Sequence, residues 1–200
     1  LMEAETVSKA RTAAAKKLSA AASDEIHALS MPNTNLIVQV AAGKEFSDLT
    51  STGLDEVNFY LQTHKDAPLV SIAKGASGGE LSRVALAIEV VIAMNEEIGT
   101  YIFDEVDAGV GGKAAIEVGR RLKELSKVAQ VIVVTHLPQV AAWGDTHFVV
   151  SKDESGSVSL SQVRKVSSES RVEEIARMLA GHEDSESARK HAEELIALSR

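Results

Sequence analysis

The sequence predicts an α/β fold with a mostly parallel sheet and a long N-terminal helix. Residues 3–30 contain neither Gly nor Pro and are rich in Ala, Lys and Glu, which is typical of one helix. Further along, helices are expected at 79–95 and 112–127, alternating with strands at 100–104 and 130–135. Because both strands are continuously apolar, the pattern indicates a parallel sheet that is buried on both faces.

The long helix would extend roughly 40 Å at about 1.5 Å per residue. Its apolar residues recur every three to five positions and are mostly small, so that they form only a weak packing seam. We therefore expect residues 1–30 to be a coiled-coil stub that packs against a partner helix outside this chain, and residues 31–200 to form a separate domain. The seam consists of Val7, Ala10, Ala14, Leu18, Ala21 and Ile26.

Further strands and helices are predicted before and after the parallel sheet. Met31-Pro32-Asn33 ends the helix, and short β-branched or aromatic runs predict a small sheet. A hairpin and two helices, separated by Gly181, are expected after the second parallel strand. The small sheet is predicted at 36–40, 56–61 and 69–72, the hairpin at 146–152 and 157–164, and the helices at 170–180 and 185–199.

The composition excludes several classes of function. No apolar run approaches the roughly 20 residues that cross a bilayer, so we expect an intracellular protein without membrane contact. The absence of cysteine excludes disulfides and thiolate chemistry. The net charge of −8 argues against a general nucleic-acid clamp, and a solvated helix face explains the early basic group as well as DNA does. That group comprises Lys9, Arg11, Lys16 and Lys17.

The first candidate motif, Ala76-Ser77-Gly78-Gly79-Glu80-Leu81-Ser82-Arg83, leads into a strongly apolar helix. Glycines allow backbone N–H groups to approach an anion, and a helix N-terminus adds partial positive charge. An ordinary helix start, with a serine cap and a glycine turn, would explain the same residues. On its own the motif leaves both interpretations open.

The second motif, Tyr101-Ile102-Phe103-Asp104-Glu105, places two adjacent carboxylates at the end of a buried strand. Ligands of α/β folds bind at this edge of the sheet, and stability alone rarely selects carboxylates that repel each other. In nucleotide hydrolysis the first would hold Mg²⁺ and the second would position the attacking water. The alternative is a strand that ends in an acidic turn. Asp107, Gly109, Gly111 and Gly112 continue it as a flexible, acidic loop.

The third motif, Val131-Ile132-Val133-Val134-Thr135-His136, places a histidine at the end of the neighbouring strand. An imidazole beside Asp104 and Glu105 can hydrogen-bond a terminal phosphate and respond to its loss. A single histidine at a strand end is usually structural, but the neighbouring carboxylates favour a functional role here. The other histidines are interpreted as surface or packing residues: His27, His64, His147, His182 and His191.

The order and spacing of the three motifs resemble the signature loop, Walker B strand with its D-loop, and switch histidine of ABC-type and SMC-type ATPase heads. The segments ASGGELSR, FDEVDAGVGG and THLPQVAAWGDTHF are similar to the RecN family of bacterial DNA repair proteins. The likeness covers residues 1–200 in outline and is strongest from 74 to 150. It implies the C-terminal lobe of a P-loop NTPase-like head, preceded by a coiled-coil arm.

The phosphate loop G-x-x-x-x-G-K-[ST] is absent from the sequence. Gly43-Lys44 and Gly112-Lys113 are the only Gly-Lys pairs, and neither has the required residues around it. In RecN-like chains this loop lies in the N-terminal lobe, so the resemblance implies that this chain cannot complete an ATP site alone and is inactive when isolated.

The resemblance implies ATP and Mg²⁺ as cofactors. The implied partners are the N-terminal lobe of the same protein, a second copy in an ATP-sandwiched homodimer, and DNA in double-strand-break repair near the cytoplasmic nucleoid. Another SMC-like ATPase, or a non-enzymatic dimerisation lobe, remains an alternative. The implied site comprises Asp104 for Mg²⁺, Glu105 and His136 as catalytic residues, and Ser77, Gly78, Gly79, Glu80 and Asp107 as contacts across the dimer.

Overall fold

The computed structural model describes every residue except 1, 44, 73–77, 94–98, 154–159, 182–184 and 200, and it leaves the side chains of 152, 153 and 160 undescribed. The chain forms two compact units, Leu1–Thr100 and Tyr101–Arg200. No helix in the described part of the chain is long and apolar enough to cross a membrane. The predicted division into residues 1–30 and 31–200 stays a prediction.

The first unit pairs the long helix with a small antiparallel sheet. Helix α1 (Met2–Ala28) confirms the predicted N-terminal helix. The sheet has the order β1-β2-β3, with Leu36 opposite Leu61 and Tyr60 opposite Ser71. Its elements are β1 (Asn35–Ala42), the short 3₁₀ helix η1 (Phe46–Asp48), β2 (Asp55–Gln62) and β3 (Val70–Ser71), followed by α3 (Gly78–Ala93). The strands and α3 were all predicted from the sequence.

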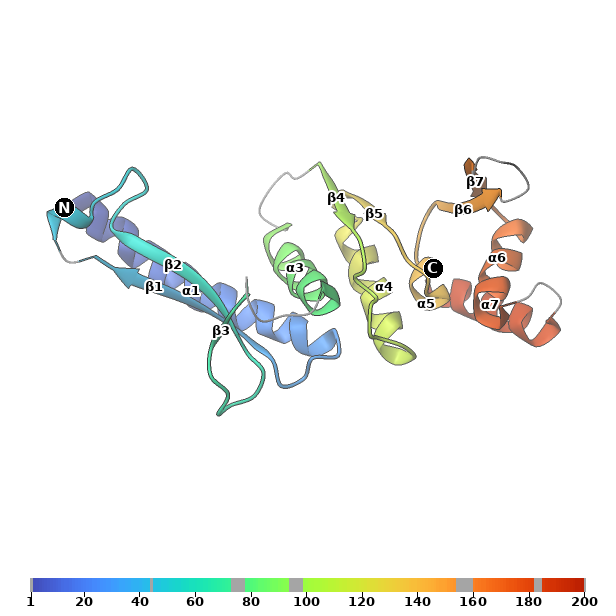
Figure 1. The fold of residues 1–200 in the computed structure, drawn as a ribbon, viewed down its shortest axis with the longest axis horizontal. Helices are drawn as coiled ribbons and strands as arrows, with labels where there is room; N and C mark the ends of the chain where they lie inside the picture. Colours follow the sequence, from blue (N-terminus) through green and yellow to red (C-terminus); the bar gives the residue numbers. More distant parts are fainter. Residues whose placement is uncertain are drawn as a thin grey trace. The chain divides into compact units, whose positions relative to one another are not determined.

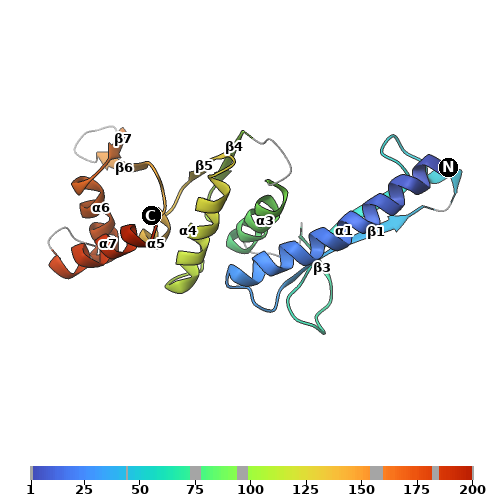
Figure 2. The same cartoon turned by 180° about the vertical axis from the view of Figure 1, so that it is seen from behind.

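Helix α1 lies along β1, as both ribbon views show (Figures 1 and 2). The backbone N–H groups of Leu36 and Val38 donate hydrogen bonds to the hydroxyls of Ser23 and Ser19, at 3.0 and 2.9 Å. Both donors belong to β1, an edge strand of the sheet, whose outward-facing backbone groups have no partner strand. The helix therefore closes this edge with side-chain hydroxyls.

The residues of α1 that are buried in this chain agree only in part with the predicted seam, of which Ile26 is buried and Leu18 and Ala21 are partly buried. Val7, Ala10 and Ala14 are exposed, whereas Ala15 and Ala22 are buried against the rest of the unit. The helix face that contacts the sheet is partly polar, because serine and arginine side chains bond to the strands. The exposed part of the predicted seam remains open to a partner helix, and that packing stays a prediction.

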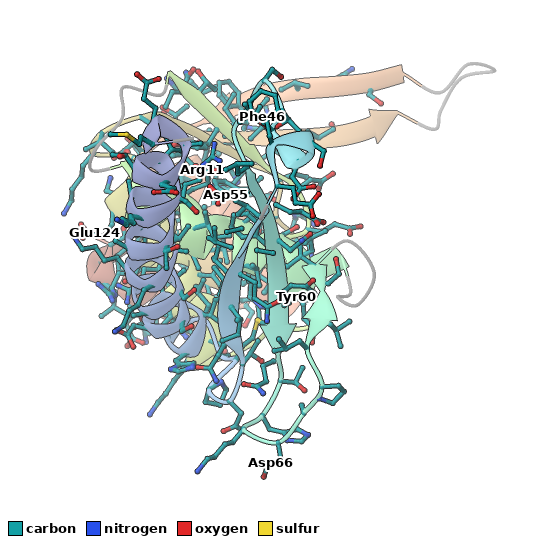
Figure 3. The ribbon with its side chains drawn as sticks, turned by 90° about the vertical axis from the view of Figure 1, so that its left-hand side faces the viewer. Arg11, Phe46, Asp55, Tyr60, Asp66 and Glu124 are labelled. Atoms are coloured by element: carbon teal, nitrogen blue, oxygen red, sulfur yellow. The ribbon has the colours of Figure 1, made fainter. Side chains whose placement is uncertain are left out.

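A buried ion pair fastens the first half of α1 to the start of β2. The Asp55 side chain is fully buried, and it accepts hydrogen bonds from Arg11, at 3.1 Å, and from the hydroxyl of Ser8. The Arg11 guanidinium also donates to the carbonyl of Thr52, at 2.7 Å. Figure 3 shows Arg11 and Asp55 together between α1 and the strands. The ion pair joins residues 44 positions apart in the sequence.

The second unit contains the predicted strand-helix-strand segment. The strands β4 (Thr100–Phe103) and β5 (Gln130–Val133) form a two-stranded parallel sheet, with α4 (Lys113–Leu125) between them in the sequence. The predicted hairpin and C-terminal helices are confirmed, and the short helix α5 is additional. These elements are α5 (Pro138–Ala141), β6 (His147–Asp153), β7 (Leu160–Val166), α6 (Glu169–Ala180) and α7 (Glu186–Leu198).

One face of the β4-β5 sheet is open, so the prediction that both faces are buried was wrong for the residues described. Ile102, Ile132 and Val134 are 71%, 45% and 59% exposed, whereas Phe103 is buried. Helix α4 lies beside the two strands in both ribbon views (Figures 1 and 2). A sheet of this kind normally has a layer on each face. The second unit supplies one layer only.

Helix α4 also holds the segment that follows β5, through a close contact between Gly119 and Trp143. A Cβ atom at Gly119 would overlap the indole ring, so only glycine allows this approach. Helices α5, α6 and α7 then share a core of Ala142, Ile175, Ala176, Ala192 and Leu195. The loop that carries His136 is therefore anchored to packed helices on its C-terminal side.

Candidate functional site

The carboxylates predicted from the second motif follow β4 directly. Asp104 and Glu105 are both exposed, next to the buried residues Phe103 and Val106. Glu105 has a φ of 55°, in the left-handed region that side chains other than glycine rarely adopt. Such a backbone costs about 1 kcal/mol. Ser30 and Ser168 lie in the same region, with φ of 66° and 50°, so this conformation by itself does not identify a site. At Glu105 it accompanies an exposed carboxylate directly after β4.

The end of β5 lies beside the end of β4. The N–H of Val134 donates to the carbonyl of Phe103 at 3.0 Å, so the residues after each strand begin at the same edge. His136 follows two residues later, and its side chain is 76% exposed. The structure therefore brings the predicted carboxylates and the predicted switch histidine to one edge of one sheet, as the parallel arrangement requires.

Asp107 is placed differently from its two neighbours in the motif. Its side chain is 1% exposed, and it accepts a hydrogen bond from the hydroxyl of Thr135. The same oxygen, Oδ2, lies 3.7 Å from Nδ1 of His136. The contacts of Asp107 in this chain thus run to the loop after β5. The predicted role of Asp107 across a dimer interface stays a prediction.

The loop after the carboxylates folds as a series of turns. The N–H of Ala108 bonds to the carbonyl of Glu105, and the N–H of Val110 bonds to that of Asp107, at 3.0 and 3.3 Å. Gly109 has a φ of 74°, a conformation in which glycine avoids the steric cost of a side chain. These turns lead from β4 to α4 along the predicted acidic loop, and the flexibility of that loop stays a prediction.

The signature motif belongs to the first unit. Gly78 and Gly79 form the first residues of α3, with Gly79 buried, whereas Ser77 lies outside the described residues. Burial lowers the pKa of Arg83, and the negative charge of Glu80, one helical turn earlier, opposes that shift. Arg83 stays charged even so, and it lies with Glu80 on the first turns of α3.

The segment after His136 is held by Arg171 of α6. Its guanidinium donates to the carbonyls of Ala142 and Gly144, at 2.8 and 2.7 Å. His147 follows, with its Nδ1 buried and without a hydrogen-bond partner among the described residues. Burial lowers the pKa of His147, the positive charge of Arg171 lowers it further, and Glu174 partly opposes them. His147 is a packing residue in this structure, as the sequence suggested.

The lowered pKa of His147 predicts a specific pH dependence of stability. Below the ordinary value of 6.5 the unfolded chain binds a proton that the folded chain resists, so the free energy of unfolding should fall as the pH drops through this window. Urea unfolding followed by fluorescence of Trp143, the only tryptophan, between about pH 5 and 7.5 would measure it. His147→Gln should remove part of the slope, and the exposed His64→Gln should not. Equal slopes in all three proteins would contradict the assignment.

Two residues that matter to the site were not singled out from the sequence. Thr135, which follows β5, donates a hydrogen bond to Asp107, which follows β4. Trp143 packs against Gly119 of α4 and so holds the segment after β5 in place. Both stand inside the quoted motif segment THLPQVAAWGDTHF, but nothing in a single sequence pairs a threonine with a carboxylate 28 residues away.

The described residues contain no group of three or more His, Asp or Glu side chains that could hold a metal ion alone. Mg²⁺ is usually bound through one or two carboxylates, with phosphate oxygens and water as further ligands. The exposed carboxylate of Asp104, beside Glu105, fits this partial role. The chain therefore offers a carboxylate to a metal-nucleotide complex and is not a self-contained metal site.

The sequence was compared with known protein families and with curated proteins. No family model matches the chain. The chain is 51% identical to the DNA repair protein RecN of Streptomyces coelicolor over 98% of its length, and 44% identical to that of Mycobacterium tuberculosis over 95%. It is 38% identical to that of Bacillus subtilis over 98%. It spans only 36%, 35% and 36% of these relatives, about a third of their length.

The solved structures that resemble it are SMC head domains. One is the Smc head domain with a coiled coil and joint from Pyrococcus yayanosii, with a TM-score of 0.58 and 23% identity, covering 92% of this chain and 29% of that one. Another is an Smc head bound to the C-winged helix domain of ScpA, with a TM-score of 0.55 and 24% identity, covering 78% and 44%. At these identities the likeness shows the fold. Over nearly its whole length the chain is similar to part of the RecN proteins, and it has the fold of an SMC head domain.

Proposed function

We propose that this chain is the C-terminal part of an SMC-like ATPase that couples ATP binding and hydrolysis to head dimerisation and DNA binding in double-strand-break repair. The observation that carries the proposal is the shared edge of β4 and β5. There Asp104 and Glu105 follow one strand, and His136 follows its bonded neighbour. The similarity to RecN proteins supports the repair role, and the SMC head fold supports the ATPase.

Each residue at this edge has a chemical role in the proposal. Asp104 would accept Mg²⁺, which neutralises charge on the transferring phosphoryl group when it is bound. Glu105 would orient the attacking water through its carboxylate, which the left-handed backbone presents to solvent. His136 would donate a hydrogen bond to the terminal phosphate from its exposed ring. The three side chains act by position and charge and need no covalent step.

The signature at the start of α3 would act on a second copy of the protein. Gly78 and Gly79 begin a helix of 16 residues, whose first N–H groups have no partner within the helix. Such groups suit an anion, and Ser77 would add a hydroxyl. In the proposal Ser77, Gly78 and Gly79 bind the terminal phosphate held by the other subunit, so that ATP joins two heads. Glu80 and Asp107 were predicted from the sequence as further residues of the same interface; the contacts of Asp107 within its own chain suggest a different role.

The open face of the β4-β5 sheet is a surface on which an N-terminal lobe could pack. Ile102, Ile132 and Val134 leave an apolar surface that a second layer would cover. The relatives are about three times as long as this chain, and the phosphate loop is absent from its sequence. We propose that the N-terminal lobe of the same protein packs on this face and supplies that loop, with ATP and Mg²⁺ between the lobes.

The proposal predicts that the isolated chain does not hydrolyse ATP, because it has no phosphate loop to hold the nucleotide. Its rate should equal that of the same chain carrying Glu105→Gln, measured by phosphate release. Adding the N-terminal region of a RecN polypeptide, expressed separately or joined to the chain, should produce ATP hydrolysis and ATP-dependent dimers. Dimerisation is measured by light scattering with and without ATP.

The outcomes separate the proposal from its alternatives. Hydrolysis by the isolated chain above the Glu105→Gln control would show that the composite site is wrong. Dimers without hydrolysis, in the presence of the N-terminal region, would favour a non-enzymatic dimerisation lobe. Hydrolysis that is unaffected by DNA ends would point to another SMC-like process rather than to break repair.

A further inference from the structure

The Asp107 carboxylate is buried beside the turn that carries His136. It has 1% exposure, and its Oδ2 accepts the hydroxyl proton of Thr135. Thr135 Oγ in turn accepts the backbone N–H of Leu137 at 3.0 Å. These two bonds lie on either side of His136 in the sequence. They hold the backbone before and after it, which restricts where the imidazole can point.

The imidazole itself faces the same carboxylate. Nδ1 of His136 lies 3.7 Å from Asp107 Oδ2, and the ring is 76% exposed. Nδ1 is thus turned toward the protein interior, and the other ring nitrogen, Nε2, is left for an external group. One carboxylate oxygen therefore restrains both the turn, through Thr135, and the ring, through its proximity to Nδ1.

Burying a carboxylate costs free energy unless it is paired or hydrogen-bonded. Here the cost is met by a threonine hydroxyl and an imidazole edge, both from the segment after β5. A carboxylate needed only for folding could pair with any neighbouring cation. Asp107 instead contacts Thr135 and His136, so its position helps to determine the geometry of the turn that carries His136.

From this arrangement we propose that Asp107 is a positioning residue of its own chain, which holds the His136 ring toward the terminal phosphate through Thr135. The inference rests on the proposed role of His136 in ATP hydrolysis. It differs from a contact across the dimer, because the partners of Asp107 are in the same chain. Thr135, which has no assigned role otherwise, becomes the link between the Walker B loop and the histidine.

The first test uses the isolated chain and needs no nucleotide. Two-dimensional NMR of ¹⁵N-histidine and ¹³C-histidine labelled protein resolves the six imidazoles, and loss of one set of signals in His136→Gln identifies His136. Thr135→Val, which removes the hydroxyl at constant shape, and Asp107→Ala should shift and broaden the His136 ring signals in the same way. The double variant should add little to either. Thr135→Ser should restore the ring signals, because it restores the hydroxyl.

The second test uses the chain assembled with its N-terminal region. Thr135→Val should lower kcat for ATP by about ten-fold or more while KM changes little, because the phosphate cradle is untouched and only the alignment of His136 is lost. Thr135→Ser should recover most of kcat. Trp143 fluorescence and circular dichroism confirm that each variant is folded, and Thr135→Val keeps the test open if Asp107→Ala does not fold.

The outcomes distinguish this inference from the proposed function. His136 signals that do not respond to Thr135→Val or Asp107→Ala overturn the positioning role and leave the ATPase proposal standing. Coupled NMR shifts in the isolated chain support the restraint on His136; if the chain assembled with its N-terminal region nevertheless does not hydrolyse ATP, the ATPase proposal is overturned and the restraint stands. Loss of ATP-dependent dimers in Asp107→Asn, with unchanged His136 signals, overturns the inference in favour of a contact across the dimer.

Discussion

Replacing Glu105 with Gln in the assembled protein should slow ATP hydrolysis by several orders of magnitude, or roughly 4 kcal/mol or more of barrier. The amide keeps the size of the side chain but lacks the negative charge that polarises and orients the attacking water. Gln and Glu make the same steric demands at the observed φ of 55°, so we expect the loop to keep its conformation. ATP binding should be nearly intact, because the proposed phosphate cradle lies in the other lobe. ATP-bound dimers should therefore accumulate.

The measurement is single-turnover hydrolysis together with nucleotide binding at equilibrium. Glu117→Gln is the matched control, since it makes the same change at another carboxylate of the second unit, on α4 and bonded to Arg120. It should leave the rate nearly unchanged. A Glu105→Gln protein that loses ATP affinity but keeps its turnover would show that the carboxylate serves binding and not the water.

Arg11→Met should destabilise the first unit by about 3 kcal/mol, because it leaves the buried Asp55 carboxylate without its cation. The Asp55 side chain has no exposed surface, and after the change only the Ser8 hydroxyl would remain among the bonds described to it. The methionine keeps most of the apolar stem of arginine, so lost packing contributes little. Hydrogen exchange of the β1 and β2 amides reports the opening free energy of this unit.

Two further variants isolate the cause. Arg120→Met removes an arginine from a pair of the same length, 3.1 Å, in which both side chains are 39% exposed. It should cost less than about 1 kcal/mol, as exposed ion pairs do. Adding Asp55→Asn to Arg11→Met should recover part of the loss, because the buried charge is then gone. A similar loss in Arg11→Met and Arg120→Met would show that burial of Asp55 does not set the cost.

The elements of the fold could be predicted because their signals are local. Apolar runs, glycines and helix periodicity lie within one segment, and they gave β4, α4 and β5 within a few residues of their observed ends. The shared edge of Asp104 and His136 followed from the short crossover between two parallel strands. The candidate site was therefore predictable wherever one strand end implied the place of the next.

The contacts that are set by the third dimension could not be predicted. The sequence analysis assigned no role to Ser19 and Ser23, yet their hydroxyls accept hydrogen bonds from the edge strand β1. The same applies to Arg11, which the sequence placed on a solvated helix face and the structure pairs with Asp55. The open face of β4 and β5 was missed because a single strand sequence records how apolar a strand is and does not record which layer covers it.

The two serines of α1 define where this helix can sit along the strand. Four helical residues rise about 6 Å and two strand residues about 6.7 Å, so the spacings of hydroxyls and strand amides nearly match over one step. If the helix slipped by four residues along β1, Ala15 or His27 would take the place of one serine, and only one of the two serine-to-amide hydrogen bonds would remain. One axial register therefore keeps both bonds. A force applied along the helix should therefore move α1 and β1 together as one rigid body, and the helix should not slide over the sheet.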